Sequence, residues 1–296
     1  MLKQFALIFA LSTLLGLSAL AQPGVQQPAE WTQPIKPFRI IGNIYWVGSA
    51  DLGSFLITTP EGHILLDVGL QENVPLVKES IQKLGFKLED VKIILNTQSH
   101  FDHAAGFAEM KKATGAKLAV MDGDAQMVER GGKGDFAWGD QYAYPAAKVD
   151  RVLHDKDTIK LGGVTMTARL TPGHTRGCTT WLMKVNEGGK TYNVVIIGSA
   201  SVPGYTLVDN KNYPEIISDY EKTFRLLKTF QSDIFLGPHG SFFDLSGKLK
   251  KLEQGTKENP FVDSQGLQEY VKRAEGAFRA QVERERAEKV KHAGLK

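Results

Sequence analysis

Short apolar runs separated by turn residues fill the first half of this chain. Strands are expected at 38–47, 54–59, 63–68, 91–95 and 117–121. Between them, apolar residues recur at helical spacing at 74–84, with further helices expected at 107–112 and 123–129. This half therefore alternates strands with helices.

The second half is also rich in strands. They are expected at 158–161, 164–170, 180–185, 192–197 and 233–236, with turns at 162–163 and 186–189. A helix is expected at 216–230, and 267–290 reads as a long amphipathic helix with a charged, solvated face. Two strand-rich halves with helices fit two sheets packed face to face and covered by helices.

The first 21 residues do not follow this pattern. Lys3 precedes an apolar run at 5–17, and Ala19-Leu20-Ala21 suits cleavage of a secretory signal peptide. The run is short for a membrane span. We therefore expect cleavage after Ala21, a periplasmic protein and no stable membrane association, with a retained anchor as the alternative. Residues 22–296 then form a single domain, with an extended arm at 22–36 and a C-terminal helix at 262–296.

Composition narrows the class of partner. The chain has 296 residues, 42% hydrophobic and 23% charged, with a formal net charge of +3. This charge is too small and too dispersed to indicate nucleic-acid binding. The single cysteine, Cys178, excludes an intrachain disulfide and reads as a small buried hydrophobe rather than a ligand.

The strand at 91–95 leads directly into a polar cluster at 96–106. His100, Asp102 and His103 supply two imidazoles and a carboxylate, which zinc accepts readily. A loop can direct such neighbours toward different metal ions, whereas a regular helix places positions i and i+3 on one face. The alternative is a polar turn with two incidental histidines.

Other candidate residues also follow strands. His174 lies in the Gly/Pro loop at 171–177, and His239 lies at 236–240. Ser199 and Ser201 follow the strand at 192–197, and their alternation places both hydroxyls on one side of an extended chain. The site residues thus collect at strand ends, where layered α/β folds build their sites.

At this point the chain resembles the metallo-β-lactamase superfamily, whose motif is His-x-His-x-Asp-His followed by two further histidines. Here Gln98 replaces the first His, and the remainder matches. The resemblance runs from Trp31 to the last helix and is closest to the third subclass of true metallo-β-lactamases. The segments at 31–34, 37–40, 62–67 and 199–205 also support it. It implies a four-layer αββα sandwich with the metal site at one edge, between the two halves.

The resemblance also implies roles for the candidate residues. Up to two Zn²⁺ ions are expected, the first held by Gln98, His100 and His174 and the second by Asp102, His103 and His239. Asp102 would also orient the attacking water. Because an amide oxygen is a poorer zinc ligand than imidazole, we expect the second site to bind more tightly.

Two serines, one aspartate and one loop also receive roles or alternatives. Ser199 and Ser201 would bind the substrate carboxylate, unless they are turn hydroxyls bonded to the backbone. Asp67 is expected to order the metal loops. The glycine-rich segment at 131–147, with Trp138, is expected near the pocket mouth, or else is an ordinary surface loop. Three histidines fit no ligand cluster, namely His63, His154 and His292.

The function implied is that of a secreted, monomeric, zinc-dependent β-lactamase acting on penicillins, cephalosporins and carbapenems. Two alternatives remain open. One is a lactonase or other ester hydrolase of the same superfamily, and the other is a non-catalytic periplasmic zinc-binding protein.

Overall fold

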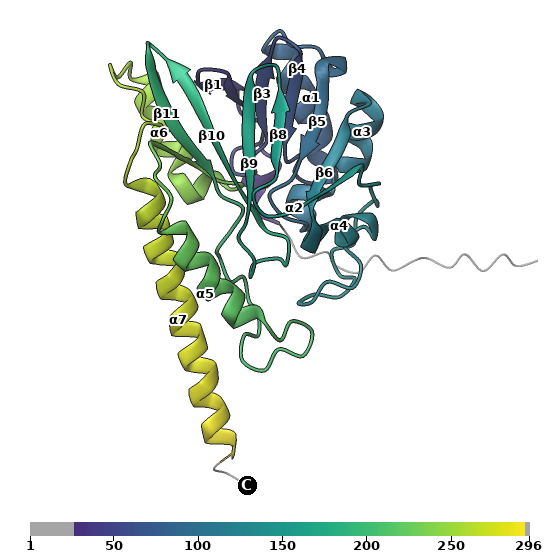
Figure 1. Cartoon of the computed structure of the whole chain (residues 1–296), viewed down its shortest axis with the longest axis vertical. Coiled ribbons are helices and arrows are strands. Elements are labelled where there is room, and N and C mark those ends of the chain that lie inside the picture. Colours follow the sequence, from purple (N-terminus) through teal and green to yellow (C-terminus); the bar gives the residue numbers. More distant parts are fainter. Residues whose placement is uncertain (1–26, 294–296) are drawn as a thin grey trace, which may run out of the picture.

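The computed structural model describes residues 27–293. The predicted signal peptide, its cleavage site and the start of the arm lie outside this range. Two sheets form the centre of the molecule (Figure 1). The first contains seven strands in sequence order. They are β1 (Phe38–Ile41), β2 (Ile44–Trp46), β3 (Phe55–Thr59), β4 (Gly62–Leu66), β5 (Val91–Leu95), β6 (Lys117–Met121) and β7 (Arg151–Leu153).

The second sheet contains five strands in the order β12-β11-β10-β9-β8. They are β8 (Thr158–Leu161), β9 (Val164–Leu170), β10 (Thr179–Glu187), β11 (Lys190–Ile196) and β12 (Ile234–Leu236). β10 is antiparallel to both β9 and β11, and β11 is parallel to β12. β9, β11 and β12 therefore run in one direction, and their carboxyl ends share one edge of the sheet.

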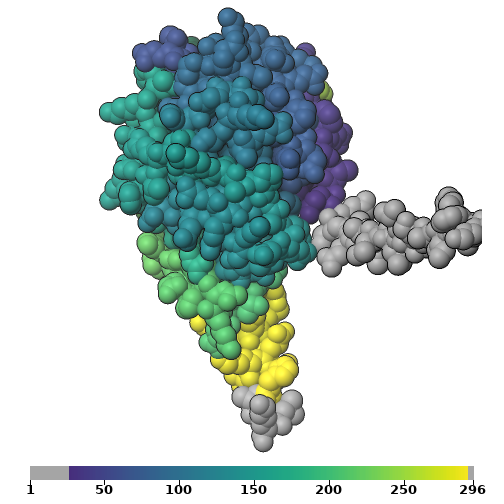
Figure 2. All heavy atoms as spheres, turned by 90° about the vertical axis from the view of Figure 1, so that its right-hand side faces the viewer, coloured from purple at the N-terminus to yellow at the C-terminus, as the bar shows by residue number. Residues whose placement is uncertain are grey.

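Helices cover the outer faces of the sheets. They are α1 (Val74–Lys83), α2 (Phe101–Ala104), α3 (Phe107–Thr114), α4 (Asp122–Glu129), α5 (Ile216–Leu227), α6 (Leu245–Glu253) and α7 (Gly266–Ala293). α1 and α3 bury Val77, Ile81, Phe107 and Met110 against the first sheet. Figure 1 shows α5 and α7 on the side of the second sheet, and Figure 2 shows α7 within a narrow projection below the body. The predicted four-layer sandwich is confirmed.

The main core lies between the sheets. Leu66 and Leu95 of the first sheet are fully buried in one cluster with Trp181 and Ile196 of the second. Burying one large apolar side chain stabilises a fold by about 1.5–3 kcal/mol, so this cluster fixes how the two sheets pack. The loops at their edges are held in place by that packing.

Several expectations need correction. The segment 101–104 is a helical turn, so Asp102 and His103 lie on α2 rather than in a loop, while His100 precedes it in extended conformation. Consecutive helical residues point about 100° apart, yet the tips of these two side chains approach each other, with Oδ2 of Asp102 3.2 Å from Nε2 of His103. The described part of the arm is not wholly extended, because residues Ala29–Trp31 form a 3₁₀ helix. Within residues 27–293, no helix is long and apolar enough to cross a membrane.

Candidate metal centre

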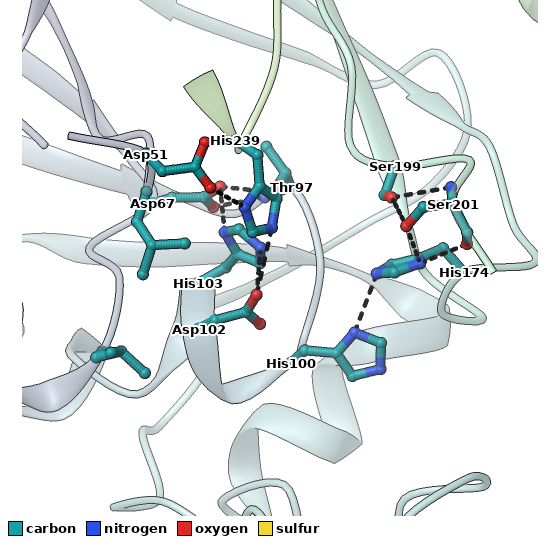
Figure 3. A network of polar contacts seen from close by, with 12 residues as sticks. Asp51, Asp67, Thr97, His100, Asp102, His103, His174, Ser199, Ser201 and His239 are labelled. Atoms are coloured by element: carbon teal, nitrogen blue, oxygen red, sulfur yellow. Dashed lines mark hydrogen bonds and ion pairs between the residues drawn. The ribbon is translucent and has the colours of Figure 1, made fainter. Parts of the chain in front are cut away.

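The predicted ligands come together where the strand ends of the two sheets meet (Figure 3). β5 ends at Leu95, three residues before Gln98, and β9 ends at Leu170, four residues before His174. β12 ends at Leu236, three residues before His239. The sheet directions explain the meeting of these distant segments, since the carboxyl ends of strands with the same direction share an edge.

The first group of ligands contains two facing imidazoles. Nδ1 of His100 lies 3.2 Å from Nε2 of His174. Gln98 is buried, and its side-chain oxygen Oε1 has no hydrogen-bond partner among the described residues. A buried oxygen without a donor is costly unless something else binds it, and a cation beside it removes that cost.

The second group contains one carboxylate between two imidazoles. Oδ2 of Asp102 lies 3.2 Å from Nε2 of His103 and 3.4 Å from Nε2 of His239. One ligand atom from each residue lies within 4.8 Å of the others. Two nitrogens and one oxygen in this arrangement match the donors that zinc accepts.

Two of the histidines have strong partners on the ring nitrogen that faces away from the ligand group. Nδ1 of His239 lies 2.9 Å from Oδ2 of Asp51, and Nδ1 of His174 lies 2.9 Å from the carbonyl oxygen of Ser201. An oxygen acceptor there keeps the ring proton on the outward nitrogen and leaves the inward one free to bind a metal.

The other two histidines have carboxylates at longer distances. Nδ1 of His103 lies 3.7 Å from Oδ2 of Asp67, and Nε2 of His100 lies 3.6 Å from Oδ2 of Asp135. All four rings thus have an oxygen near the outward nitrogen. This pattern is typical of metal-binding histidines.

The charges within the second group are strongly coupled. Burial opposes ionisation of Asp102, but His103 and His239 outweigh it and hold the pKa of that carboxyl well below its usual range. Burial likewise disfavours a charged His239, yet Asp102 and Asp51 raise its pKa to about 9. Burial and the neighbouring His100 lower the pKa of His174 well below its usual value. The second group therefore favours positive charge, as a cation site should.

Asp67 connects the end of β4 to the metal loop. Its Oδ1 accepts a hydrogen bond of 2.7 Å from the backbone N–H of Thr97, and its Oδ2 accepts one of 2.5 Å from the hydroxyl of Thr97. Its φ of 58° lies in the left-handed region, which Asp tolerates better than most residues. Burial raises the pKa of Asp67 to about 6. Asp67 thus lies where a residue that orders the metal loop is expected.

Asp124 on α4 joins the two loops of the first group. Its carboxylate accepts hydrogen bonds from the N–H of Ser99, the hydroxyl of Thr175 and the N–H of Gly177, at 2.9, 2.7 and 2.8 Å. Gly177 packs so closely that a Cβ there would lie 2.3 Å from the backbone nitrogen of Asp124. These contacts fix His100 and His174 relative to each other.

The two predicted serines occupy different positions. Their hydroxyl oxygens lie 3.1 Å apart, so the expected common side is observed. Ser201 lines the cleft at the metal centre, whereas Ser199 is 1% exposed and lies behind it. The N–H of Ser201 also donates to the Ser199 hydroxyl, as expected if this serine is partly a turn hydroxyl.

The cleft over these residues has a volume of about 400 Å³. Aromatic side chains from the arm, from α2 and from the glycine-rich loop form its walls, namely Trp31, Phe101, Trp138 and Tyr142. The rings of Phe101 and Tyr142 stack 4.4 Å apart. The segment 131–147 therefore does border the pocket. A larger cleft of about 680 Å³, on the second sheet around Thr167, Leu182 and Phe230, contains none of the predicted ligands.

Sequence reasoning missed four residues around the centre. Trp31 was noted only as a motif residue, and Asp51, Asp124 and Asp135 carried no local signal, because each acts on a partner far away in the sequence. The histidines outside the motifs stay outside the centre, as expected. His63 packs against Phe86, and His154 lies on the surface near Asp157.

The family model described as the metallo-beta-lactamase superfamily matches residues 54–239. The native FEZ-1 metallo-β-lactamase from Legionella gormanii is 48% identical, with a TM-score of 0.84 over 86% of this chain and 98% of that one. BJP-1 of Bradyrhizobium japonicum, a subclass B3 metallo-β-lactamase, is 37% identical, with a TM-score of 0.83 over 88% and 98%.

Curated relatives match over shorter stretches. A probable metallo-hydrolase of Burkholderia pseudomallei is 32% identical over 93 residues, which is 31% of each protein. A hydroxyacylglutathione hydrolase of Rhodopseudomonas palustris is 29% identical over 122 residues, 41% of this chain and 39% of that protein. The chain thus spans less than half the length of these curated relatives. The family model and the similar structures nevertheless cover most of the chain, which therefore belongs to the metallo-β-lactamase superfamily.

Proposed function

We propose that this protein is a zinc-dependent β-lactamase. The observation that carries the proposal is the ligand geometry, in which inward ring nitrogens face one another and outward nitrogens face oxygens. It is supported by similarity to subclass B3 metallo-β-lactamases over nearly their whole length. The first zinc would be held by Gln98, His100 and His174, and the second by Asp102, His103 and His239.

Bound zinc lowers the pKa of a coordinated water to about 7 and polarises a carbonyl. The chain's own residues provide the rest. Asp102 holds the second group together and accepts a hydrogen bond from the attacking water. The hydroxyl of Ser201 donates to the substrate carboxylate at the cleft wall. The aromatic walls around Trp31 and Trp138 contact the apolar parts of the substrate and exclude bulk water.

Gln98 makes the two sites unequal in this proposal. Its neutral amide oxygen replaces an imidazole nitrogen, and zinc prefers the nitrogen. The second site, with one carboxylate and two imidazoles, should therefore fill first and support most of the turnover.

An ester or thioester hydrolase is the second candidate. It is favoured by the curated relatives named hydroxyacylglutathione hydrolases. Opposing it, the resemblance places Ser199 where most of the wider superfamily has an Asp, and the Ser199 hydroxyl is bonded to Ser201. The only carboxylate in the ligand cluster of the described residues is that of Asp102.

One set of assays separates these functions. The purified chain is given a penicillin, nitrocefin, a carbapenem, a lactone panel and a hydroxyacyl glutathione thioester, each with added zinc and with EDTA. Hydrolysis of the β-lactams that EDTA abolishes and clavulanate does not inhibit would support the proposal. His239→Ala should lose this activity, whereas the exposed His154→Ala should keep it.

Other outcomes would decide against it. Turnover confined to the lactones or the thioester would identify an ester hydrolase. Stoichiometric zinc binding without turnover on any substrate would identify a non-catalytic zinc-binding protein.

We also propose export to the periplasm, with cleavage after Ala21. The basis is the composition of residues 1–21. Mass spectrometry of secreted material tests this, because an intact Met1 in the mature protein would refute the cleavage.

A further inference from the structure

We propose that Asp135 is a positioning residue for the first metal site, and that it selects the tautomer of His100 that can bind zinc. The inference rests on the metal sites of the proposed function but does not depend on which substrate is hydrolysed. It also assigns a role to the glycine-rich loop at 131–147, for which the sequence suggested only a place near the pocket.

The Asp135 carboxylate has two distinct sides. Oδ1 accepts hydrogen bonds from the N–H groups of Ala137 and Trp138, at 2.8 and 2.9 Å. Oδ2 is directed toward Nε2 of His100, 3.6 Å away, and the Asp135 side chain is 11% exposed. The loop thus fixes one oxygen of the carboxylate and presents the other to His100.

The position of the ring proton on His100 decides whether it can bind a metal. A neutral imidazole carries one N–H, and the other nitrogen has the free lone pair. Nδ1 is the nitrogen that faces His174, at 3.2 Å from its Nε2. Zinc binding there requires the proton on Nε2. A carboxylate can only accept hydrogen bonds, so Asp135 beside Nε2 favours that tautomer over the competing one, in which Nδ1–H of His100 donates to Nε2 of His174.

Tyr205 is the other group near Nε2 of His100. Its hydroxyl oxygen lies 3.4 Å away, and its proton is donated to the carbonyl oxygen of His174 at 2.9 Å. Its oxygen therefore also acts as an acceptor toward His100. Asp135 differs because it carries a negative charge, which attracts an Nε2–H more strongly than a neutral hydroxyl oxygen does.

The charge of Asp135 matters more in this chain because of Gln98. A neutral amide oxygen weakens the first site, so a carboxylate behind His100 offsets part of that loss. The same loop places the ring of Trp138 5.0 Å from that of His100. Asp135 thereby connects the aromatic wall of the cleft to a metal ligand.

The sharpest variant is Asp135→Asn. The amide oxygen of Asn can keep the two bonds to Ala137 and Trp138, so the loop is retained. Its NH₂ group then faces Nε2 of His100 and donates to it, which shifts the ring proton to Nδ1. Asp135→Ser is the second variant, because its hydroxyl can still accept from the loop backbone but places no group against His100.

The matched control is Asp140→Asn in the same loop. Oδ1 of Asp140 accepts a hydrogen bond of 2.8 Å from the N–H of Gly134. This control removes the same charge from the same loop while retaining a backbone acceptor. Tyr205→Phe tests the competing acceptor.

Two measurements are made on each protein. Long-range ¹H–¹⁵N NMR of the metal-free form reports which ring nitrogen of His100 carries the proton. Competition with a chelator in stepwise zinc titrations reports the affinity of each site. We expect the natural protein to show Nε2–H, and Asp135→Asn to show Nδ1–H.

For Asp135→Asn we also expect first-site affinity to fall about 10–100-fold, with the second site unchanged, as is typical for residues behind a metal ligand. The first-site affinity of Asp135→Ser should lie between those of the natural protein and Asp135→Asn. The affinity of Asp140→Asn should match that of the natural protein. The proposal is overturned if Asp135→Asn alters neither tautomer nor affinity, if both sites weaken equally, or if only Tyr205→Phe shifts the proton. A protein that binds zinc as described but hydrolyses no β-lactam would refute the proposed function while leaving this inference intact.

Discussion

Oδ2 of Asp51 lies 2.9 Å from Nδ1 of His239, across a sequence separation of 188 residues. The other oxygen of Asp51 accepts a hydrogen bond of 2.8 Å from the N–H of Ser241. The loop between β2 and β3 therefore orients His239, the predicted ligand that follows β12. This contact is the shortest between a carboxylate and a histidine in the described centre.

Asp51→Ala should weaken zinc binding at the second site by about 10–100-fold, because His239 loses the acceptor that fixes its tautomer. Zinc content across a chelator titration measures this. Glu30→Ala, which removes an exposed carboxylate nearby, is the control. Equal zinc retention by Asp51→Ala and the natural protein would show that Asp51 does not support the metal.

Gln98→His should raise zinc affinity at the first site, since imidazole nitrogen is the better zinc ligand. The natural protein should fill the second site first, so Asp102→Ala or His239→Ala should lower kcat/KM more than Gln98→Ala. Zinc content and kcat/KM are measured for each variant. If the natural protein holds both zinc ions equally tightly and Gln98→His changes neither affinity, the first site is not weak.

Ser201→Ala should raise KM more than Ser199→Ala, because Ser201 lines the cleft and Ser199 lies behind it. A lost hydrogen bond to a charged group costs about 1.5–3 kcal/mol before water compensates, which corresponds to a rise of roughly 10–160-fold in KM. The double variant should raise KM more than it lowers kcat. Steady-state kinetics on one β-lactam test both statements. A large fall in kcat at constant KM would contradict a binding role.

Asp124→Ala should destabilise the fold by about 3 kcal/mol or more, because three donors, on Ser99, Thr175 and Gly177, would lose their acceptor in a buried site. Urea denaturation of the metal-free protein gives the free energy of unfolding. Asp122→Ala, at the exposed first residue of the same helix, is the control and should change it little. A similar small effect for both variants would mean that water replaces the Asp124 carboxylate.

Zinc binding at the second site should release a proton from His239 below pH 9. The pKa of His239 is raised to about 9 in the metal-free protein, so below that pH both ring nitrogens carry a proton. The proton on the inward nitrogen must leave before zinc binds. Zinc affinity at the second site should therefore fall as the pH decreases below 9. Above pH 9, fewer protons should be released for each zinc ion bound. Calorimetry in buffers of different ionisation enthalpy measures the number released. A release that is unchanged between pH 7 and pH 10 would contradict this assignment.

The raised pKa of His239 also affects the stability of the metal-free protein. A folded-state pKa above the ordinary value of about 6.5 means that the folded state binds the proton more tightly than the unfolded state. This stabilising contribution is fully present below about pH 6.5 and is lost as the pH rises through about 9.

Elements with a strong local pattern of apolar residues and turns could be predicted from the sequence. The boundaries of β5, β6, β8 and β9 agree with those expected from apolar runs and turns. The sequence also placed the ligands at strand ends and, through the motif, indicated the family. β7 was missed because its first two residues are exposed and it offers only one buried apolar side chain. α6 was missed because polar and charged residues dominate it, with Lys248 buried beside Asp263.

The residues that support the predicted ligands could not be predicted, because their contacts form only when the chain is folded. His100 and His174 face each other across 74 residues, while Asp51 and Asp135 reach their partners from separate loops and Asp124 does so from α4. No local periodicity encodes such contacts, because an acidic residue in a loop reads as solvated until its neighbours are known. The packing of the two sheets sets the relative positions of their edge loops. Those positions determine which carboxylate lies behind which imidazole, and therefore which ring nitrogen is left free for a metal.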